Sequence, residues 1–259
     1  MFKDLQDSLL RIGIAIELAK TDVRKSYTRT AIGPFWETIS LGILLFLMSV
    51  LWGKLIEIKE NYVMYLVTGM IVFRYISLIL NSSTWTFIER ADIVKYFNIP
   101  HSSLALSKVI YASFIFLHHL PLLFVFSFFY GKTIFNFNLI YLLYSIPVIL
   151  ITAYSASLII GFLTARFRDI QSLINTITSV MIFFTPILWS PSRLDAKAQL
   201  YLVDPNIFYH YIELFRQPFL GNKPDTFSIL VTLFFTIFIF FFQIGYLINF
   251  QAKLGTGCK

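Results

Sequence analysis

The chain has 259 residues, of which 57% are hydrophobic and 14% are charged. Soluble domains are typically about 45–50% apolar and about 25% charged, so an ordinary soluble domain is excluded and a membrane protein is indicated. The formal net charge is +7, but the basic residues are spread among apolar runs, which favours a bias toward cytoplasmic loops over nucleic-acid binding. A single cysteine, Cys258, leaves no internal disulfide and no cysteine metal site.

Residues 1–30 are expected to form an amphipathic helix at the membrane surface. Apolar residues recur there at steps of three and four, and the charged residues lie off this stripe. The stripe consists of Leu5, Leu9, Ile12, Ile16, Ala19, Val23 and Tyr27. Packing on soluble protein is the alternative, but the rest of the chain offers no soluble core, so an interfacial helix is favoured. Acidic residues mixed into this stretch argue against a cleaved signal peptide.

Six apolar runs follow, each long enough to cross a hydrocarbon core of about 30 Å. They cover residues 34–56, 62–83, 103–130, 138–165, 170–190 and 226–250. An even number of spans places both termini on one side, and the segments on that side carry more lysine and arginine than the loops opposite, so both termini are predicted to be cytoplasmic. The expected fold is an all-α membrane protein with an interface helix at 1–30 and a six-span domain at 31–259.

The second run contains a charge near its middle, Arg74. A charge at membrane depth costs several kcal/mol unless it meets water or a partner. Two interpretations remain open: Arg74 faces a cavity or partner, or the span is shifted and the side chain snorkels to the interface.

The segment between the second and third runs, about 84–99, has helical spacing and both signs of charge, including Glu89, Arg90, Asp92 and Lys95. A solvated connecting helix would not expose apolar residues such as Ile93 and Phe97, so we expect this cytoplasmic helix to dock onto a partner protein or the membrane surface. Arg166 and Arg168 precede Asp169, a candidate N-cap for the fifth span, and are placed to meet lipid headgroups or acidic residues of a partner.

The fourth run carries small residues at steps of four: Ala153, Ser157, Gly161 and Ala165. Such a strip allows another helix to approach closely. The neighbour is either a helix of the same chain or one of a second copy, and the first is favoured.

Between the last two runs, residues 191–225 are too long for a turn and are divided by Pro191, Pro205, Pro218 and Pro224. The middle of this segment is nevertheless apolar and aromatic. Because irregular backbone at membrane depth must be shielded by protein or water, we expect short re-entrant or surface helices.

Three kinds of chemistry are excluded or disfavoured. Gly131-Lys132-Thr133 imitates the end of a phosphate-binding loop, but Phe126 stands where the first glycine of that loop is required. His118 and His119 are adjacent and diverge by about 100° on a helix, so they do not share a metal without distant ligands. The spans contain almost no carboxylates apart from Glu37, which disfavours catalysis.

Five sequence blocks together resemble the membrane subunit of polysaccharide-exporting type-2 ABC transporters, which move O-antigen, capsule or teichoic-acid chains. The blocks are RKSYTRTAIGPFW (24–36), ARFRDI (165–170), TPILW (185–189), PNIFYH (205–210) and RQPFLG (216–221). The resemblance covers nearly the whole chain, and the order and spacing of the blocks against six spans make it specific. Two departures are Thr28, where a basic residue is common, and Asp204, where asparagine is usual.

The resemblance implies a channel built from two copies of this chain in the bacterial inner membrane. It also implies two separate ATPase subunits that bind ATP and Mg²⁺. The expected cargo is an undecaprenyl-linked polysaccharide, with O-antigen as the first candidate. Four groups of residues follow from it. They are the coupling residues Glu89, Arg90, Asp92, Lys95, Arg166, Arg168 and Asp169; the entry residues Arg24, Lys25, Tyr27 and Arg29; the channel residues Tyr62, Tyr65, Arg74, Tyr75 and His118; and the periplasmic gate residues Phe208, Tyr209, His210 and Arg216 within about 191–222.

Two rival classes are a secondary transporter and a membrane enzyme of glycan assembly. The first is expected to show internal repeats and buried ionisable relays, and the second needs carboxylates placed for acid and base roles. The sequence shows neither pattern.

Overall fold

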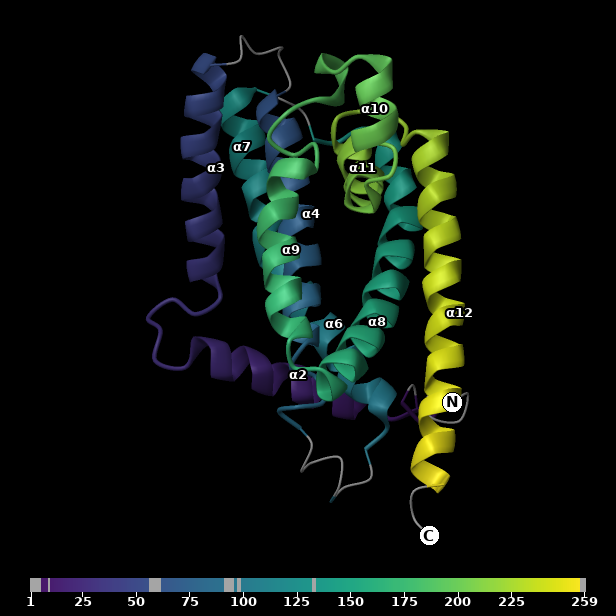
Figure 1. Cartoon of the computed structure of the whole chain (residues 1–259). Helices are drawn as coiled ribbons and strands as arrows, with labels where there is room; N and C mark the ends of the chain where they lie inside the picture. Colours follow the sequence, from purple (N-terminus) through teal and green to yellow (C-terminus); the bar gives the residue numbers. More distant parts are fainter. Residues whose placement is uncertain are drawn as a thin grey trace.

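The computed structural model describes residues 6–8, 10–55, 62–90, 96, 99–131 and 134–256. Within these residues all regular structure is helical (Figure 1). The helices are α2 (Ile12–Tyr27), α3 (Phe35–Leu55), α4 (Tyr62–Ser83), α6 (His101–His119), α7 (Pro121–Tyr130), α8 (Leu142–Arg166), α9 (Ile170–Phe184), α10 (Ala196–Leu202), α11 (Ile207–Phe219) and α12 (Thr226–Thr256), with short 3₁₀ helices η1 (Phe137–Tyr141) and η2 (Pro191–Arg193).

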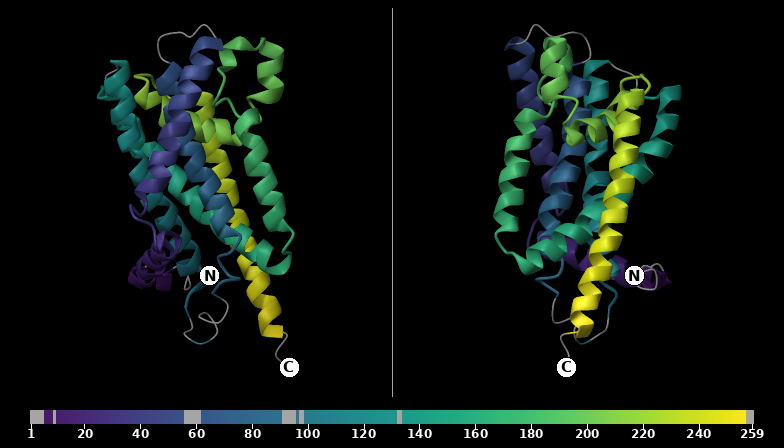
Figure 2. Two further views of the ribbon diagram at one scale, coloured as in Figure 1. Left: turned by 90° about the vertical axis from the view of Figure 1, so that its left-hand side faces the viewer. Right: turned by 45° about the vertical axis from the view of Figure 1, so that its right-hand side comes forward.

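The long helices run side by side as a bundle, and α2 lies across one end of it (Figures 1 and 2). We call this the α2 end and the opposite end, which carries α10, the α10 end. The turn between α8 and α9 also lies at the α2 end, whereas α11 lies beneath α10 (Figure 1).

Five of the six predicted spans are confirmed as helical segments long and apolar enough to cross a membrane: Phe35–Trp52, Tyr62–Ser83, His101–Tyr130, Phe137–Arg166 and Thr226–Gly245. The third of these is made of α6 and α7, which are divided at Leu120. Pro121 has no backbone N–H and its ring crowds the preceding turn, so a helix is broken or bent at this point.

Only part of the run predicted as the fifth span, 170–190, is helical. Helix α9 has 15 residues and therefore a length of about 22 Å, less than the hydrocarbon core of about 30 Å. It ends because Thr185 precedes Pro186 and takes an extended conformation, with ψ 136°, as sterics before proline favour. The following residues 185–188 are buried without being helical.

Helix α2 has two different faces. Ala15, Ala19 and Asp22 are buried, and α2 packs chiefly against α6. Ile12 and Ile16, which belong to the predicted apolar stripe, remain 46% and 37% exposed. The small residues thus serve protein packing, and the larger apolar residues are left for a membrane interface. The helix begins at Ile12 because the backbone at Arg11 departs from helical geometry, with ψ 35°, so residues 1–30 are not one continuous helix.

The predicted strip of small residues on α8 is used within the chain. A Cβ atom placed on Gly161 would lie 2.7 Å from the ring of Phe87 and 3.3 Å from the carbonyl oxygen of Ser83. Ala153 packs in a cluster with Tyr75 of α4 and residues of α6. Close approach of α8 to these segments therefore explains the strip without a second copy.

Short helices form in the 191–222 segment, as predicted. Helix α11 packs against α4, α8 and α12, and its residues 210–216 are all buried. Asn206 caps its first turn by accepting a hydrogen bond from the backbone N–H of Tyr209, which explains why the helix begins directly after Pro205 and Asn206.

Candidate functional site

Helix α9 carries a polar stripe that is open to its surroundings. Ser172, Asn175, Thr176 and Ser179 are all exposed, and their spacing of three and four residues places them on one face. A membrane helix that faces lipid is apolar on that side. This face of α9 is therefore suited to water or to another polar surface.

Arg74 is exposed on the side of α4 that faces α9. Asn81, two turns further along α4 and hence on the same face, donates a hydrogen bond to the hydroxyl of Thr178 on α9 (3.3 Å). The Arg74 guanidinium pairs with Glu37 in the first turn of α3 at 3.4 Å, with the two side chains 49% and 37% exposed. Arg74 is thus paired with a charge and still accessible.

The corner between α2 and α3 holds the predicted entry residues. Arg24 and Lys25 are exposed in the last turn of α2. Arg29 has the left-handed φ of 67° and Gly33 a φ of 56°, and these turns redirect the chain from α2 into α3. Burial, with a contribution from the nearby charge of Glu37, raises the pKa of the Tyr27 hydroxyl, so this hydroxyl stays neutral.

The predicted coupling helix at 84–99 is wrong over residues 84–90, which form consecutive turns. Hydrogen bonds from the backbone of Thr84, Trp85 and Thr86 reach back only three residues, and this tight winding packs Phe87 against Gly161. Asp92 and Lys95, also predicted to couple, lie outside the described residues.

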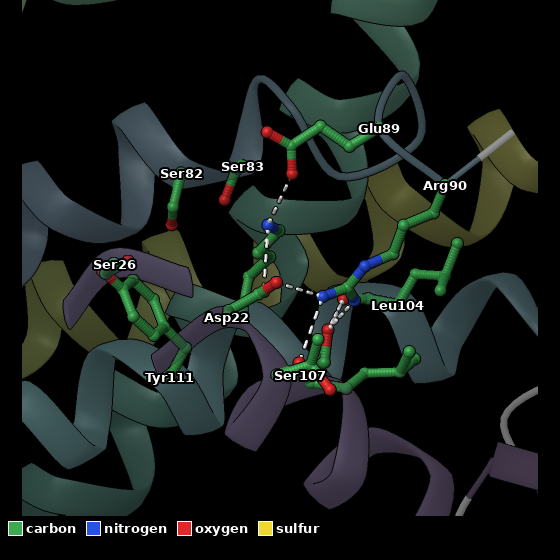
Figure 3. Close-up of polar contacts among 12 residues, drawn as sticks. Asp22, Ser26, Ser82, Ser83, Glu89, Arg90, Leu104, Ser107 and Tyr111 are labelled. Atoms are coloured by element: carbon green, nitrogen blue, oxygen red, sulfur yellow. Dashed lines mark hydrogen bonds and ion pairs between the residues drawn. The ribbon is translucent and has the colours of Figure 1, made fainter. Parts of the chain in front are cut away.

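Arg90 and Glu89, predicted together, differ in exposure. The Arg90 side chain is 4% exposed and pairs with Asp22 of α2, whereas Glu89 is 47% exposed and lies 3.6 Å from the ammonium group of Lys108 (Figure 3). Arg90 is therefore not available for direct contact with another protein, because its guanidinium is already enclosed by this chain.

The other predicted coupling residues lie together between α8 and α9. Arg166, Arg168 and Asp169 are all exposed at the α2 end. Asp169 occupies the N-cap position of α9, as predicted, but its side chain makes no capping hydrogen bond to the described residues.

The predicted channel tyrosines are held by hydrogen bonds inside the chain. Tyr62 donates to the carbonyl of Leu188 (2.7 Å), and Tyr65 donates to that of Pro186 (2.8 Å). Tyr75 is 5% exposed and lines an apolar cavity of ≈ 210 Å³ together with the predicted gate residue Phe208. The hydroxyls of Tyr62 and Tyr65 thus fasten α4 to the segment after α9, and Tyr75 lies in the core of this chain.

His118, the last predicted channel residue, is half-buried at the end of α6. A ring nitrogen lies 2.8 Å from the carbonyl oxygen of Phe114, and the ring stands edge-on to that of Phe35. Among the described residues no three His, Cys, Asp or Glu side chains gather to hold a metal ion.

The predicted gate residues surround a buried ion pair in α11. Arg216 has a 0% exposed side chain and pairs with Glu213 at 2.6 Å. Its guanidinium also donates to the carbonyl of Pro186 (3.0 Å) and lies 3.7 Å over the ring of Tyr65. A Cβ on Gly69 would lie 2.0 Å from this guanidinium, so glycine is needed at that turn of α4.

The neighbouring gate residues tie α11 to its surroundings. His210 is 1% exposed, and its two ring nitrogens meet the hydroxyl of Ser228 on α12 (2.9 Å) and the carbonyl of Asp204 (2.8 Å). Burial raises the pKa of Tyr209. The predicted gate segment is therefore tightly packed and joined to α4 and α12.

Sequence reasoning missed four residues that these sites use: Asp22, Lys108, Glu213 and Gly69. Two signals were present. Asp22 continues the spacing of Ala15 and Ala19 on the small face of α2, and Glu213 stands three residues before Arg216 in an apolar segment. For Lys108 and Gly69 the partner lies far away in the chain, and no local pattern identifies it.

Residues 16–220 match the family model described as ABC-2 type transporter, and the chain therefore belongs to this family. The membrane domain of the family is not itself catalytic, and the ATPase lies in a partner subunit. Among curated proteins, the chain is similar to two O-antigen export system permease proteins RfbA from Klebsiella pneumoniae. They are 24% and 23% identical to it, each over 189 residues that make up 71% of this chain and 71% of the relative. The chain is a distant homologue of these permeases.

Proposed function

We propose that this chain forms the channel of an exporter that moves an undecaprenyl-linked polysaccharide, O-antigen in the first place, across the bacterial inner membrane. The observation that carries the proposal is the similarity to O-antigen export permeases over 71% of both chains. ATP hydrolysis in two copies of the partner ATPase drives the movement. Both chain termini and the α2 end face the cytoplasm, and the α10 end faces the periplasm.

The polar stripe of α9 and the accessible Arg74 support a path on this side of the bundle. Hydroxyl and amide groups there would replace water around a sliding sugar chain, and a positive charge suits the anionic link between lipid and glycan. One copy leaves this side open, so a second copy closes the channel. Helix α3 stands next to this opening with Trp36 and Phe46 more than half exposed.

The exposed charges at the α2 end fit contacts outside the membrane. We assign Arg24, Lys25 and Arg29 to the anionic headgroups of carrier lipid and membrane, with Tyr27 beside them. Exposed Glu89, together with the cluster Arg166, Arg168 and Asp169, is assigned to the ATPase. The α10 and α11 segment is assigned to the periplasmic gate.

A deletion strain tests the function. Loss of the gene should remove the polysaccharide from the cell surface and leave full-length lipid-linked polymer inside, as seen by surface immunoblotting and lipid extraction. Complementation should require a hydrolysis-competent partner ATPase. Export that persists with an inactive ATPase would indicate a secondary transporter, and an altered polymer structure would indicate an enzyme of glycan assembly. Either result would overturn the proposal.

Cysteine labelling tests the path. In a Cys258→Ser background, Asn175→Cys and Ser179→Cys should react with a membrane-impermeant maleimide, and polymer in the channel should protect them. Val180→Cys is the matched control, because Val180 is 43% exposed on the neighbouring apolar face. Equal labelling of positions 179 and 180 would contradict a water-lined stripe.

A further inference from the structure

Three segments that are far apart in the chain meet around one buried carboxylate. Asp22 of α2 accepts hydrogen bonds from Arg90, which follows α4, at 2.5 Å and from Lys108 of α6 at 3.1 Å (Figure 3). The side chains of all three residues are at most 9% exposed. We call these residues the Asp22 cluster.

Further hydrogen bonds fix the guanidinium of Arg90 between two helices. It donates to the hydroxyl of Ser107 on α6 (2.6 Å) and to the carbonyl of Leu18 on α2 (3.2 Å). The Ser107 hydroxyl in turn donates to the carbonyl of Leu104 (2.7 Å). A planar guanidinium with several partners has one preferred geometry, so the position of Arg90 is set by α2 and α6 together.

The other side of the 84–90 segment is wedged against α8. The Phe87 ring stacks on Phe162 with the ring centroids 4.3 Å apart and fills the space left by Gly161. Thr84 and Thr86 are buried as well. The segment therefore touches the α2 and α6 pair through Arg90 and the helix leading to α9 through Phe87.

Within the described part of the chain, the charge balance of the cluster reaches the surface at Glu89. Arg90 and Lys108 carry two positive charges, while Asp22 carries one negative charge. Glu89 supplies the second, 3.6 Å from Lys108 and 47% exposed. A protein that binds Glu89 would therefore act directly on the buried charges, which are weakly screened.

From this arrangement we infer that the Asp22 cluster is a mechanical linkage that makes α2 and the 84–90 segment move as one unit when the ATPase acts on exposed Glu89. Asp22 and Lys108 are positioning residues in this linkage, and Phe87 carries the same displacement to α8 and the polar helix α9. The inference rests on the proposed function, because it requires a partner that hydrolyses ATP.

The linkage predicts a split between ATP hydrolysis and export. The complex of this chain with its ATPase would be reconstituted in liposomes with lipid-linked polymer. Lys108→Met leaves Asp22 and Arg90 as a neutral pair, so the protein should assemble, but export per ATP should fall about tenfold, within the range of ordinary coupling free energies. Lys108→Arg keeps the charge and should retain most coupling. Lys20→Gln, in an exposed pair on α2, should change nothing.

Spin labels test the linkage without relying on transport. Lys25 and Trp85 are both exposed, so labels at Lys25→Cys and Trp85→Cys in a Cys258→Ser background report on α2 and the 84–90 segment. Their distance should stay constant with and without nucleotide and should become broadly distributed when Asp22→Asn is added. The linkage would be overturned if Lys108→Met left export per ATP unchanged, or if it lowered hydrolysis and export in equal proportion. It would also be overturned if the distance between the labels did not respond to Asp22→Asn. A wild-type complex that fails to export would instead count against the proposed function.

Discussion

The two ends of the bundle bury charges in different ways. At the α2 end, Asp22 binds partners 68 and 86 residues away in the chain. At the α10 end, Glu213 and Arg216 are three residues apart on one helix. Both groups are nearly inaccessible, but the first joins separate segments and the second joins two turns of the same helix. Burial alone therefore does not tell what a charge does; the distance along the chain between its partners does.

The physical consequence follows from where each group is attached. A cluster that spans three segments resists their separation, because each unpaired charge would be left in a medium of low dielectric. A pair within one helix moves with that helix and fixes what lies around it, here Tyr65, Pro186 and Gly69. The cluster around Asp22 is therefore suited to transmitting a displacement between segments. The pair in α11 is suited to holding one segment rigid.

The largest effect on stability is expected from Asp22→Ala. It leaves Arg90 and Lys108 buried without their shared carboxylate and should lower the free energy of unfolding by about 3–5 kcal/mol. Denaturant titration of the purified chain in detergent would measure this loss. Asp169→Ala serves as the control, since Asp169 is exposed and makes no capping hydrogen bond within the described chain. If both variants lost the same free energy of unfolding, the buried contacts of Asp22 would not contribute to stability as expected.

A smaller loss is expected from Glu213→Leu at the other end. The guanidinium of Arg216 keeps its contacts with the carbonyl of Pro186 and the ring of Tyr65. We therefore expect the free energy of unfolding to fall by about 2–3 kcal/mol, less than is usual when a buried ion pair is broken. The double variant Glu213→Leu with Arg216→Leu removes both charges and should recover most of this stability. Additive losses in the same titration would show that the two side chains do not act as a pair.

Gly69→Ala should lower the free energy of unfolding by about 1–3 kcal/mol, as is usual when a core is overpacked. The added methyl would lie 2.0 Å from the Arg216 guanidinium, which cannot move without losing its pairing. In an Arg216→Ala background the same change should be nearly neutral, and thermal unfolding of the four proteins gives the coupling. A penalty that persists there would assign the clash to another neighbour.

The smallest effect is expected from Lys20→Gln. Lys20 and Glu17 pair at 2.7 Å, but their side chains are 57% and 72% exposed, and exposed pairs contribute little to stability. The midpoint of unfolding should therefore not change measurably. A clear shift would mean that this face of α2 is covered in the protein tested.

The sequence was informative where one local property decides the structure. Five of the six long apolar runs form the spans that they predicted, and the prolines after residue 190 predicted the short helices there. It failed where a single residue ends an element, as at Pro186, or where turns replace a helix, as at residues 84–90. The charge pattern singled out Arg90 and the family resemblance singled out Arg216, but neither indicated that these side chains are buried, because Asp22 and the Tyr65 ring reach them only through the tertiary fold.

Helix α11 also determines at what stage of synthesis the α10 end can finish folding. Spans that are apolar throughout enter a bilayer as each leaves the ribosome, but a segment of 13 residues is too short to span, and its two charges are costly in lipid. Its shelter includes α4 and α8, made before it, and α12, made after it. The α10 end is therefore completed only once the last helix has been synthesised and inserted, and a nascent chain that lacks α12 leaves one side of α11 uncovered.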